Sequence, residues 1–215
     1  MSTSYYNFLG PIDNHSLFST QEHYSDSQYM YYYQNSVSSF AYLIPSIYVF
    51  NKKYKHYNDY KYIIFIEDTI VQLNLFLLSF VSFLWWASQR HYIHNYDIVL
   101  YSNSIVLIGL YSLSKNKLIS NKLFIGAFSV FIALIVYLIH VNNRDTIKLM
   151  NLTSSVFSGY ALIRNKYNDV FCIFIMSIIF KLIDTYFLNF DMYIMSGTAW
   201  FHTISAFGYL FLVMK

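Results

Sequence analysis

The final apolar stretch, Met195 to Met214, reads MSGTAWFHTISAFGYLFLVM and decides the fold. Twenty mostly apolar residues are enough for a helix to cross a bilayer. An ionisable side chain at the centre of such a helix costs roughly 2.5–3.5 kcal/mol on insertion scales, and it usually faces the protein interior. His202 is therefore a candidate site residue. The alternative is a histidine near the membrane interface that hydrogen-bonds a neighbouring helix.

The composition extends this interpretation to the whole chain. Of its 215 residues, 56% are hydrophobic and 12% are charged, which is about half the charged share of a typical soluble domain. Apolar runs near 20 residues recur throughout, so we expect an all-α integral membrane protein; the ten-residue alternating segments of a β-barrel are absent. The single cysteine, Cys172, excludes an intramolecular disulfide and a cysteine-based metal site. Basic residues gather in connectors, so no nucleic-acid partner is expected.

We expect a seven-helix bundle in one domain, residues 29–215, after a polar N-terminal segment, residues 1–28. That segment has no basic region followed by an apolar core, so we expect no cleavable signal peptide. The short connectors favour an up-and-down arrangement. The expected spans are 29–50, 62–87, 97–114, 123–140, 147–163, 169–188 and 193–214.

Basic residues predict the orientation of this bundle. The connectors 51–61, 115–122 and 164–168 are rich in lysine and arginine, whereas the intervening connectors hold only Arg90 and Arg144. Basic connectors face the cytoplasm. We therefore expect the N-terminus outside or in the lumen and the C-terminus in the cytoplasm.

The strongest polar pattern surrounds the second connector. If the flanking helices form a hairpin, Ser82 and Asp97 approach one another near its outer mouth. Asp97 opens the third span, where it could instead cap the helix N-terminus. On a helix, the spacing of His91, His94 and Asp97 would align three metal-ligating side chains, although connector histidines more often meet lipid headgroups or water.

Two pairs of ionisable residues within spans have structural interpretations. Lys181 and Asp184, three positions apart in the sixth span, are expected to pair with one another. Glu67 and Asp68 are expected to reach the membrane interface or the lysines that precede them.

Three segments together resemble a known family. The first span holds Asn35-Ser36-Val37-Ser38-Ser39 and continues to Pro45. The second holds Ser82-x3-Trp86, with Asp97 eleven residues further on, and the last holds Thr198-x3-His202. In order and spacing these segments resemble the alkaline ceramidases, seven-helix intramembrane amidohydrolases whose superfamily includes the adiponectin receptors. The resemblance covers residues 18 to 213.

The resemblance implies a zinc site with altered ligands. In that family three histidines hold Zn²⁺, whose bound water attacks the ceramide amide with help from a serine and an aspartate. The resemblance assigns the catalytic positions to Ser82 and Asp97, and one ligand position to His202. Trp86 and Thr198 occupy the other two, where an indole offers only a donor N–H and a threonine hydroxyl is a poor neutral ligand. We therefore expect zinc to be absent or weakly bound.

A calcium site of the family is also altered. Its acidic segment corresponds to residues 18–24, which read FSTQEHY, and Tyr32 stands where the first helix should carry a glutamate. Because Ca²⁺ needs several charged oxygen ligands, we expect no calcium here.

The resemblance thus implies a protein of the endoplasmic reticulum or Golgi membrane that binds ceramide or another long-chain amide lipid and hydrolyses it poorly or not at all. Trp86, Trp200 and Tyr32 are expected to line its lipid pocket. A structural membrane protein without a small ligand is one alternative, and a retinal photoreceptor is disfavoured because the last span lacks a central lysine. Another is an active hydrolase whose metal is relocated to His91, His94 and His140, with His202.

Overall fold

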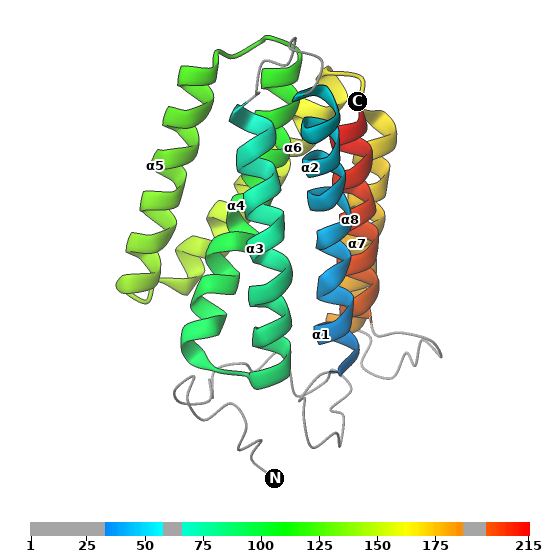
Figure 1. Cartoon of the computed structure of the whole chain (residues 1–215). Coiled ribbons are helices and arrows are strands. Elements are labelled where there is room, and N and C mark those ends of the chain that lie inside the picture. Colours follow the sequence, from blue (N-terminus) through cyan, green and yellow to red (C-terminus); the bar gives the residue numbers. More distant parts are fainter. Residues whose placement is uncertain (1–32, 58–65, 187–196) are drawn as a thin grey trace.

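The computed structural model describes residues 33–57, 66–186 and 197–215, and every regular element among them is helical. The helices form an up-and-down bundle with α5 at one edge (Figure 1). The polar segment predicted at residues 1–28 lies outside the described part. The elements are α1 (Tyr33–Ser39), the 3₁₀ turn η2 (Phe40–Tyr42), α2 (Leu43–Tyr57), α3 (Ile66–Ser88), α4 (His91–Lys115), α5 (Asn121–His140), α6 (Arg144–Arg164), α7 (Asn168–Tyr186) and α8 (Gly197–Met214).

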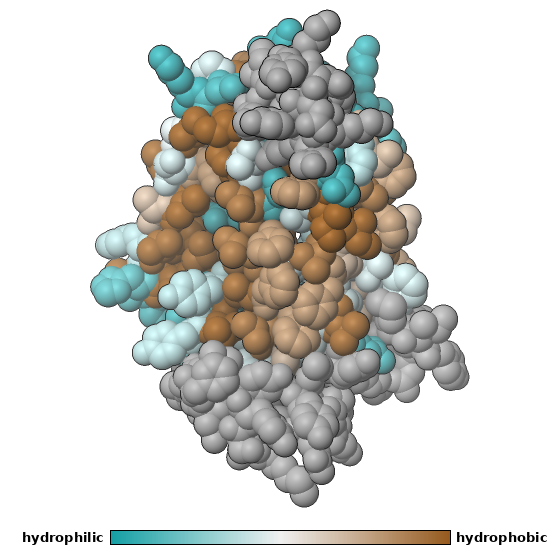
Figure 2. Space-filling view, viewed as in Figure 1, coloured by the Kyte–Doolittle hydropathy of each residue, from teal (hydrophilic) through white to brown (hydrophobic). Residues whose placement is uncertain are grey.

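This is a helical membrane protein. Among the described helices, α3, α4, α5 and α8 are long and apolar enough to cross a bilayer. Large apolar side chains also face outward, such as Val130 on α5 and Val156 on α6, which are 69% and 67% exposed. Figure 2 shows apolar residues over much of the visible face. The count of seven spans and the orientation stay predictions.

The start of the third predicted span is wrong by six residues. α4 begins at His91, so the link from α3 comprises only Gln89 and Arg90. Asp97 therefore lies in the second turn of α4 and does not cap its N-terminus. The polar composition of this stretch favoured a connector. In the structure the stretch is helical, and the His94 ring on α4 stacks on Trp85 of α3 with 4.0 Å between centroids.

The first predicted span ends too early. α2 continues to Tyr57 and so includes Lys52 and two further lysines that had been assigned to a connector. The Lys52 ammonium donates to the Val213 carbonyl at 3.1 Å, near the end of α8. A long lysine stem can extend a helix beyond its apolar part while the charged group reaches polar partners.

Gly109 allows α4 and α6 to approach closely. A Cβ atom at this position would lie 2.5 Å from the Phe157 ring and 2.9 Å from the Ser158 Oγ. That hydroxyl accepts a hydrogen bond from the Gly109 N–H at 3.2 Å and donates to the Ile105 carbonyl at 2.6 Å. Small residues and hydroxyl groups are typical of helix contacts in membranes.

Three helices end on a residue with left-handed backbone conformation that is not glycine. Lys117, Asn142 and Lys166 have φ angles of 57°, 54° and 63°. In each case the following N–H bonds to a carbonyl five residues earlier, as from Leu118 to Leu113 at 2.9 Å. These are Schellman motifs, and they satisfy carbonyl groups that the helix end would leave without partners.

Glu67 and Asp68 are buried at the start of α3. They are 2% and 3% exposed and bond to α4. Asp68 accepts from the Tyr111 hydroxyl at 2.7 Å and pairs with Lys115 at 2.9 Å, while Glu67 accepts from Ser114 at 3.0 Å. These bonds to α4 could not be predicted from the sequence, and the expected contacts with the interface or the preceding lysines stay predictions.

We expect Asp68→Asn to lower the thermal midpoint of the protein in detergent micelles. The change removes the charge that Lys115 pairs with, and hydrogen bonds to charged groups contribute roughly 1.5–3 kcal/mol. Asp145→Asn is the matched control, because its pair with Lys148 is exposed and such pairs contribute little. Equal midpoints for the two variants, followed by tryptophan fluorescence, would show that the buried pair does not stabilise the bundle.

Candidate functional site

A cavity of about 180 Å³ lies among η2, α3, α4, α7 and α8, and we call it the polar cavity. It contains the residue types that acid–base or binding chemistry uses, next to aromatic side chains. The lining residues are Tyr42, Leu78, Ser82, Trp86, Asp97, Tyr101, Lys181, Thr198, Phe201 and His202.

The five residues that the resemblance singled out all line this cavity: Ser82 and Trp86 from α3, Asp97 from α4, and Thr198 and His202 from α8. Each same-helix pair is four residues apart, so both members lie on one face. Ser82 and Asp97, expected to approach one another, both line this cavity. The chemical roles of these residues stay predictions.

The serine-rich segment of α1 holds the His202 ring. The imidazole Nδ1 lies 3.0 Å from the Ser38 hydroxyl and 3.3 Å from the Ser39 hydroxyl. The Ser39 hydroxyl also lies 2.8 Å from the Asn35 carbonyl and 3.2 Å from the Ser82 hydroxyl. This segment therefore links the histidine on α8 to the serine on α3.

Lys181 belongs to the polar cavity, which the sequence interpretation missed. Its ammonium donates to the Thr198 hydroxyl at 2.5 Å and lies 5.4 Å from the centre of the Trp86 ring. The side chain of Asp184, its expected partner, is outside the described part. The available signal was the cost of a lysine inside an apolar helix, the same cost that singled out His202.

Trp200 and Tyr32 were also expected in the lipid pocket, and neither is among the residues that line the two described cavities. Trp200 lines neither described cavity, and its ring stacks on Phe180 with 5.8 Å between centroids. Trp200 is two positions from both Thr198 and His202, which places it on another face of the helix, so its role in a lipid pocket stays a prediction. Tyr32 lies outside the described residues.

The histidines proposed for a relocated metal site are in separate places. His94 stacks on Trp85, His91 lies 3.4 Å from the Asn95 amide, and His140 is exposed at the end of α5. Within residues 33–57, 66–186 and 197–215, no group of three histidine, cysteine or acidic side chains could hold a metal ion. The relocated site stays a prediction without a supporting cluster in this part of the chain.

The polar cavity also does not fit the family's zinc ion. Of its three expected ligand positions, only His202 offers an imidazole. The other two, Trp86 and Thr198, contact the Lys181 ammonium instead, and a positive charge at this place would repel a divalent cation. The expected calcium position falls on residues 18–24 and Tyr32, outside the described residues.

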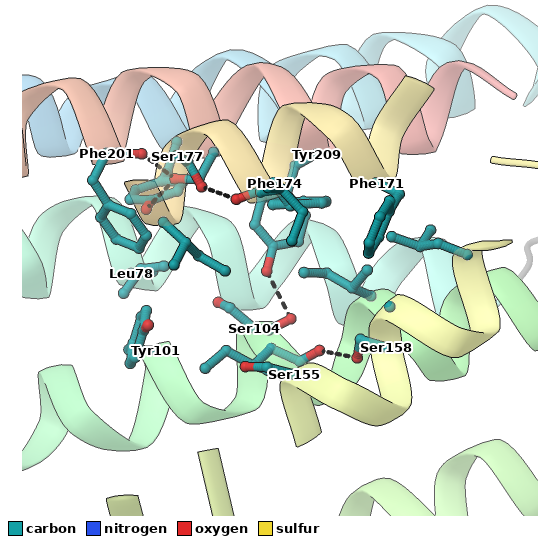
Figure 3. Close-up of a pocket in the computed structure, with 18 residues that line it drawn as sticks. Leu78, Tyr101, Ser104, Ser155, Ser158, Phe171, Phe174, Ser177, Phe201 and Tyr209 are labelled. Carbon is teal, nitrogen blue, oxygen red and sulfur yellow. Dashed lines mark hydrogen bonds between the residues drawn. The ribbon is translucent and has the colours of Figure 1, made fainter. Parts of the chain in front are cut away.

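A second cavity of about 90 Å³, which we call the apolar pocket, adjoins the first. The two share Tyr42, Leu78, Tyr101 and Phe201. The pocket continues between α4, α6, α7 and α8, past Phe171 and Phe174 and others (Figure 3).

The serine hydroxyl groups and the Tyr209 hydroxyl around the apolar pocket are already bonded within the protein. The Tyr209 hydroxyl donates to the Ser104 carbonyl at 2.6 Å (Figure 3). The serines donate to backbone carbonyls: Ser104 to Leu100, Ser155 to Asn151, Ser158 to Ile105, Ser177 to Phe174 and Ser205 to Phe201. The pocket therefore presents a largely apolar surface despite its serines.

No family model matches this chain, and no curated protein matches it. The ceramidase resemblance thus depends on the motifs around Ser82, Asp97 and His202 and on their arrangement in the polar cavity.

Proposed function

We propose that this chain is a membrane-embedded lipid-binding protein of the alkaline ceramidase type. It binds ceramide or another long-chain amide lipid and hydrolyses it poorly or not at all. The observation that carries this proposal is the junction of the polar cavity and the apolar pocket, which share Tyr42, Leu78, Tyr101 and Phe201. A lipid has the same two parts, a polar head group and an acyl chain.

The polar cavity supplies most of the selectivity in this proposal. Lipid tails in the bilayer are already in an apolar medium, so moving a tail into the apolar pocket gains little. A head group gains more, because Ser82, Asp97, Thr198 and Lys181 offer donors and acceptors that the hydrocarbon region lacks. The pocket then limits the length and shape of the tail.

Weak or absent hydrolysis follows from the ligand positions. Amide hydrolysis in the family depends on a metal that lowers the pKa of its bound water, and Trp86 and Thr198 do not provide ligands for one. Asp97 could still accept a proton and Ser82 could donate a hydrogen bond, but neither group generates the hydroxide nucleophile by itself.

The proposal also includes seven spans, a cytoplasmic C-terminus and, by resemblance, the endoplasmic reticulum or Golgi membrane. The basic groups of Lys52, Lys115 and Lys215 support this orientation, because their contacts lie at the end of the bundle opposite the polar cavity. Positive charge at one end is typical of the cytoplasmic side.

We expect the purified chain in detergent micelles to bind N-pyrenedodecanoyl sphingosine saturably and to release no pyrenedodecanoic acid, with or without added Zn²⁺. Pyrene-labelled dodecane, which has a tail but no head group, is the control and should show no saturable binding. Absence of saturable ceramide binding would contradict the proposed function. Zinc-dependent release of the labelled acid would instead support the hydrolase with relocated ligands.

A further inference from the structure

Trp86 and Thr198 fail as zinc ligands but suit an ammonium ion. The face of an indole ring attracts a cation through its quadrupole, and the Lys181 nitrogen lies 5.4 Å from the Trp86 ring centre. A threonine hydroxyl accepts hydrogen bonds, and the same nitrogen donates to Thr198 at 2.5 Å. Trp86 and Thr198, which stand where the resemblance would place histidines, therefore have one common explanation: both contact the Lys181 ammonium.

One acidic and one basic side chain are among the described residues that line the polar cavity. The acidic residue is Asp97 on α4 and the basic residue is Lys181 on α7. The Lys181 charge interacts with both Asp97 and His202. The Asp97 Oδ1 atom is buried and accepts no hydrogen bond from the described residues, so this acceptor has unused hydrogen-bonding capacity next to the cavity.

We propose that the Lys181 ammonium is the fixed cation of the polar cavity, standing where the resemblance would place a metal ion. Together with Asp97 it makes the cavity neutral overall, and the cavity therefore selects a long-chain lipid with an uncharged head group over one with an anionic head group. An anionic lipid would leave an unbalanced charge in a water-poor site, which is costly. The lipid half of this inference rests on the proposed function, whereas the metal half does not.

The metal half is tested by restoring the two missing imidazoles. We expect the Trp86→His/Thr198→His variant to remain nearly free of zinc, because the Lys181 charge repels the ion. Adding Lys181→Met should allow binding of about one zinc per chain, measured by elemental analysis of purified protein. Adding Lys181→Arg is the matched control, since it keeps the charge and should keep the protein free of zinc.

Two results would overturn the metal half. In one, the variant with two new histidines and intact Lys181 binds zinc as fully as the variant that also carries Lys181→Met. In the other, all these variants elute as folded monodisperse protein and none binds zinc, so the three positions do not converge. If the methionine variant aggregates, Lys181→Gln replaces it with the same expected zinc content.

The lipid half is tested by comparing the affinities of the protein for N-pyrenedodecanoyl sphingosine and for pyrenedodecanoic acid at mildly alkaline pH, where the acid is ionised. We expect wild-type protein to prefer the ceramide at least about tenfold. Asp97→Asn removes a negative charge from the cavity lining and should shift the preference toward the carboxylate by about tenfold or more, a factor that corresponds to a modest electrostatic difference. Lys181→Met should weaken carboxylate binding further, and exposed Lys148→Met, the control, should change neither affinity.

The outcomes separate the two proposals. If wild-type protein binds neither probe, the proposed function is wrong, and the zinc measurements still decide the role of Lys181. If wild-type protein binds the ceramide but Asp97→Asn leaves the preference between the probes unchanged, the proposed function stands and the charge selection by Lys181 and Asp97 is wrong.

Discussion

Gly109→Leu is expected to prevent normal assembly of the bundle or to lower its thermal midpoint strongly. The first added carbon would already lie 2.5 Å from the Phe157 ring, and a leucine places three more carbons in the same contact between α4 and α6. Overpacking of a closed contact costs typically 1–3 kcal/mol and occasionally more. We expect a loss of about 3 kcal/mol or more, because the Ser158 bonds to α4 would be disrupted as well.

Gly126→Leu is the matched control for this prediction. Gly126 lies on α5, and a Cβ atom there would meet nothing within 4 Å. The two variants make the same chemical change within a long apolar helix, so helix propensity and mean hydropathy shift equally. Thermal midpoints from tryptophan fluorescence, together with gel-filtration profiles in detergent, measure the difference. Equal behaviour of the two variants would show that α4 and α6 do not meet at Gly109.

Ser155→Phe is expected to weaken binding of N-pyrenedodecanoyl sphingosine by about tenfold or more. Ser155 lines the apolar pocket, and its hydroxyl donates only to the Asn151 carbonyl of its own helix. A phenyl ring there would occupy space that the acyl chain needs, and forcing it into a filled pocket carries an overpacking cost of about 1–3 kcal/mol. Binding of a ceramide with an acetyl group in place of the long chain should change little.

Thr153→Phe provides the control on the same helix. Its hydroxyl donates to the Met150 carbonyl and its side chain is exposed, so both substitutions remove a hydrogen bond within α6 and add a phenyl ring. Competition binding with the two ceramides measures the effect. If both variants bind the long-chain probe as tightly as wild type, the acyl chain does not enter the apolar pocket.

The sequence could predict which side chains of one helix face the polar cavity, because helical spacing determines which residues share a face. Two pairs of residues are each about one helical turn apart: Ser82 with Trp86, and Thr198 with His202. The resemblance then predicted that the helices carrying these pairs meet. The same periodicity places Trp200 on another face of the helix than Thr198 and His202, because it is two positions from each.

Lys181 and the start of α4 could not be placed in the same way. The predicted pair of Lys181 with Asp184 stays a prediction, because the Asp184 side chain is outside the described part. The contact of Lys181 with Thr198 could not be predicted, because it depends on how α7 packs against α8. The polar residues after Gln89 resembled a connector, but they form the first turns of α4, where His94 stacks on Trp85 of α3. Both cases depend on contacts between helices.

The left-handed residues that follow α4, α5 and α6 are positions where a substitution could raise the stability of the protein. Glycine in such a position would relieve strain of roughly 1 kcal/mol each. Lys117 and Lys166, however, contribute positive charges to connectors that we predict to face the cytoplasm, so exchanging them would weaken the signal for the predicted orientation. Asn142 carries no charge, so Asn142→Gly would raise the thermal stability of the protein without removing a basic residue from a connector.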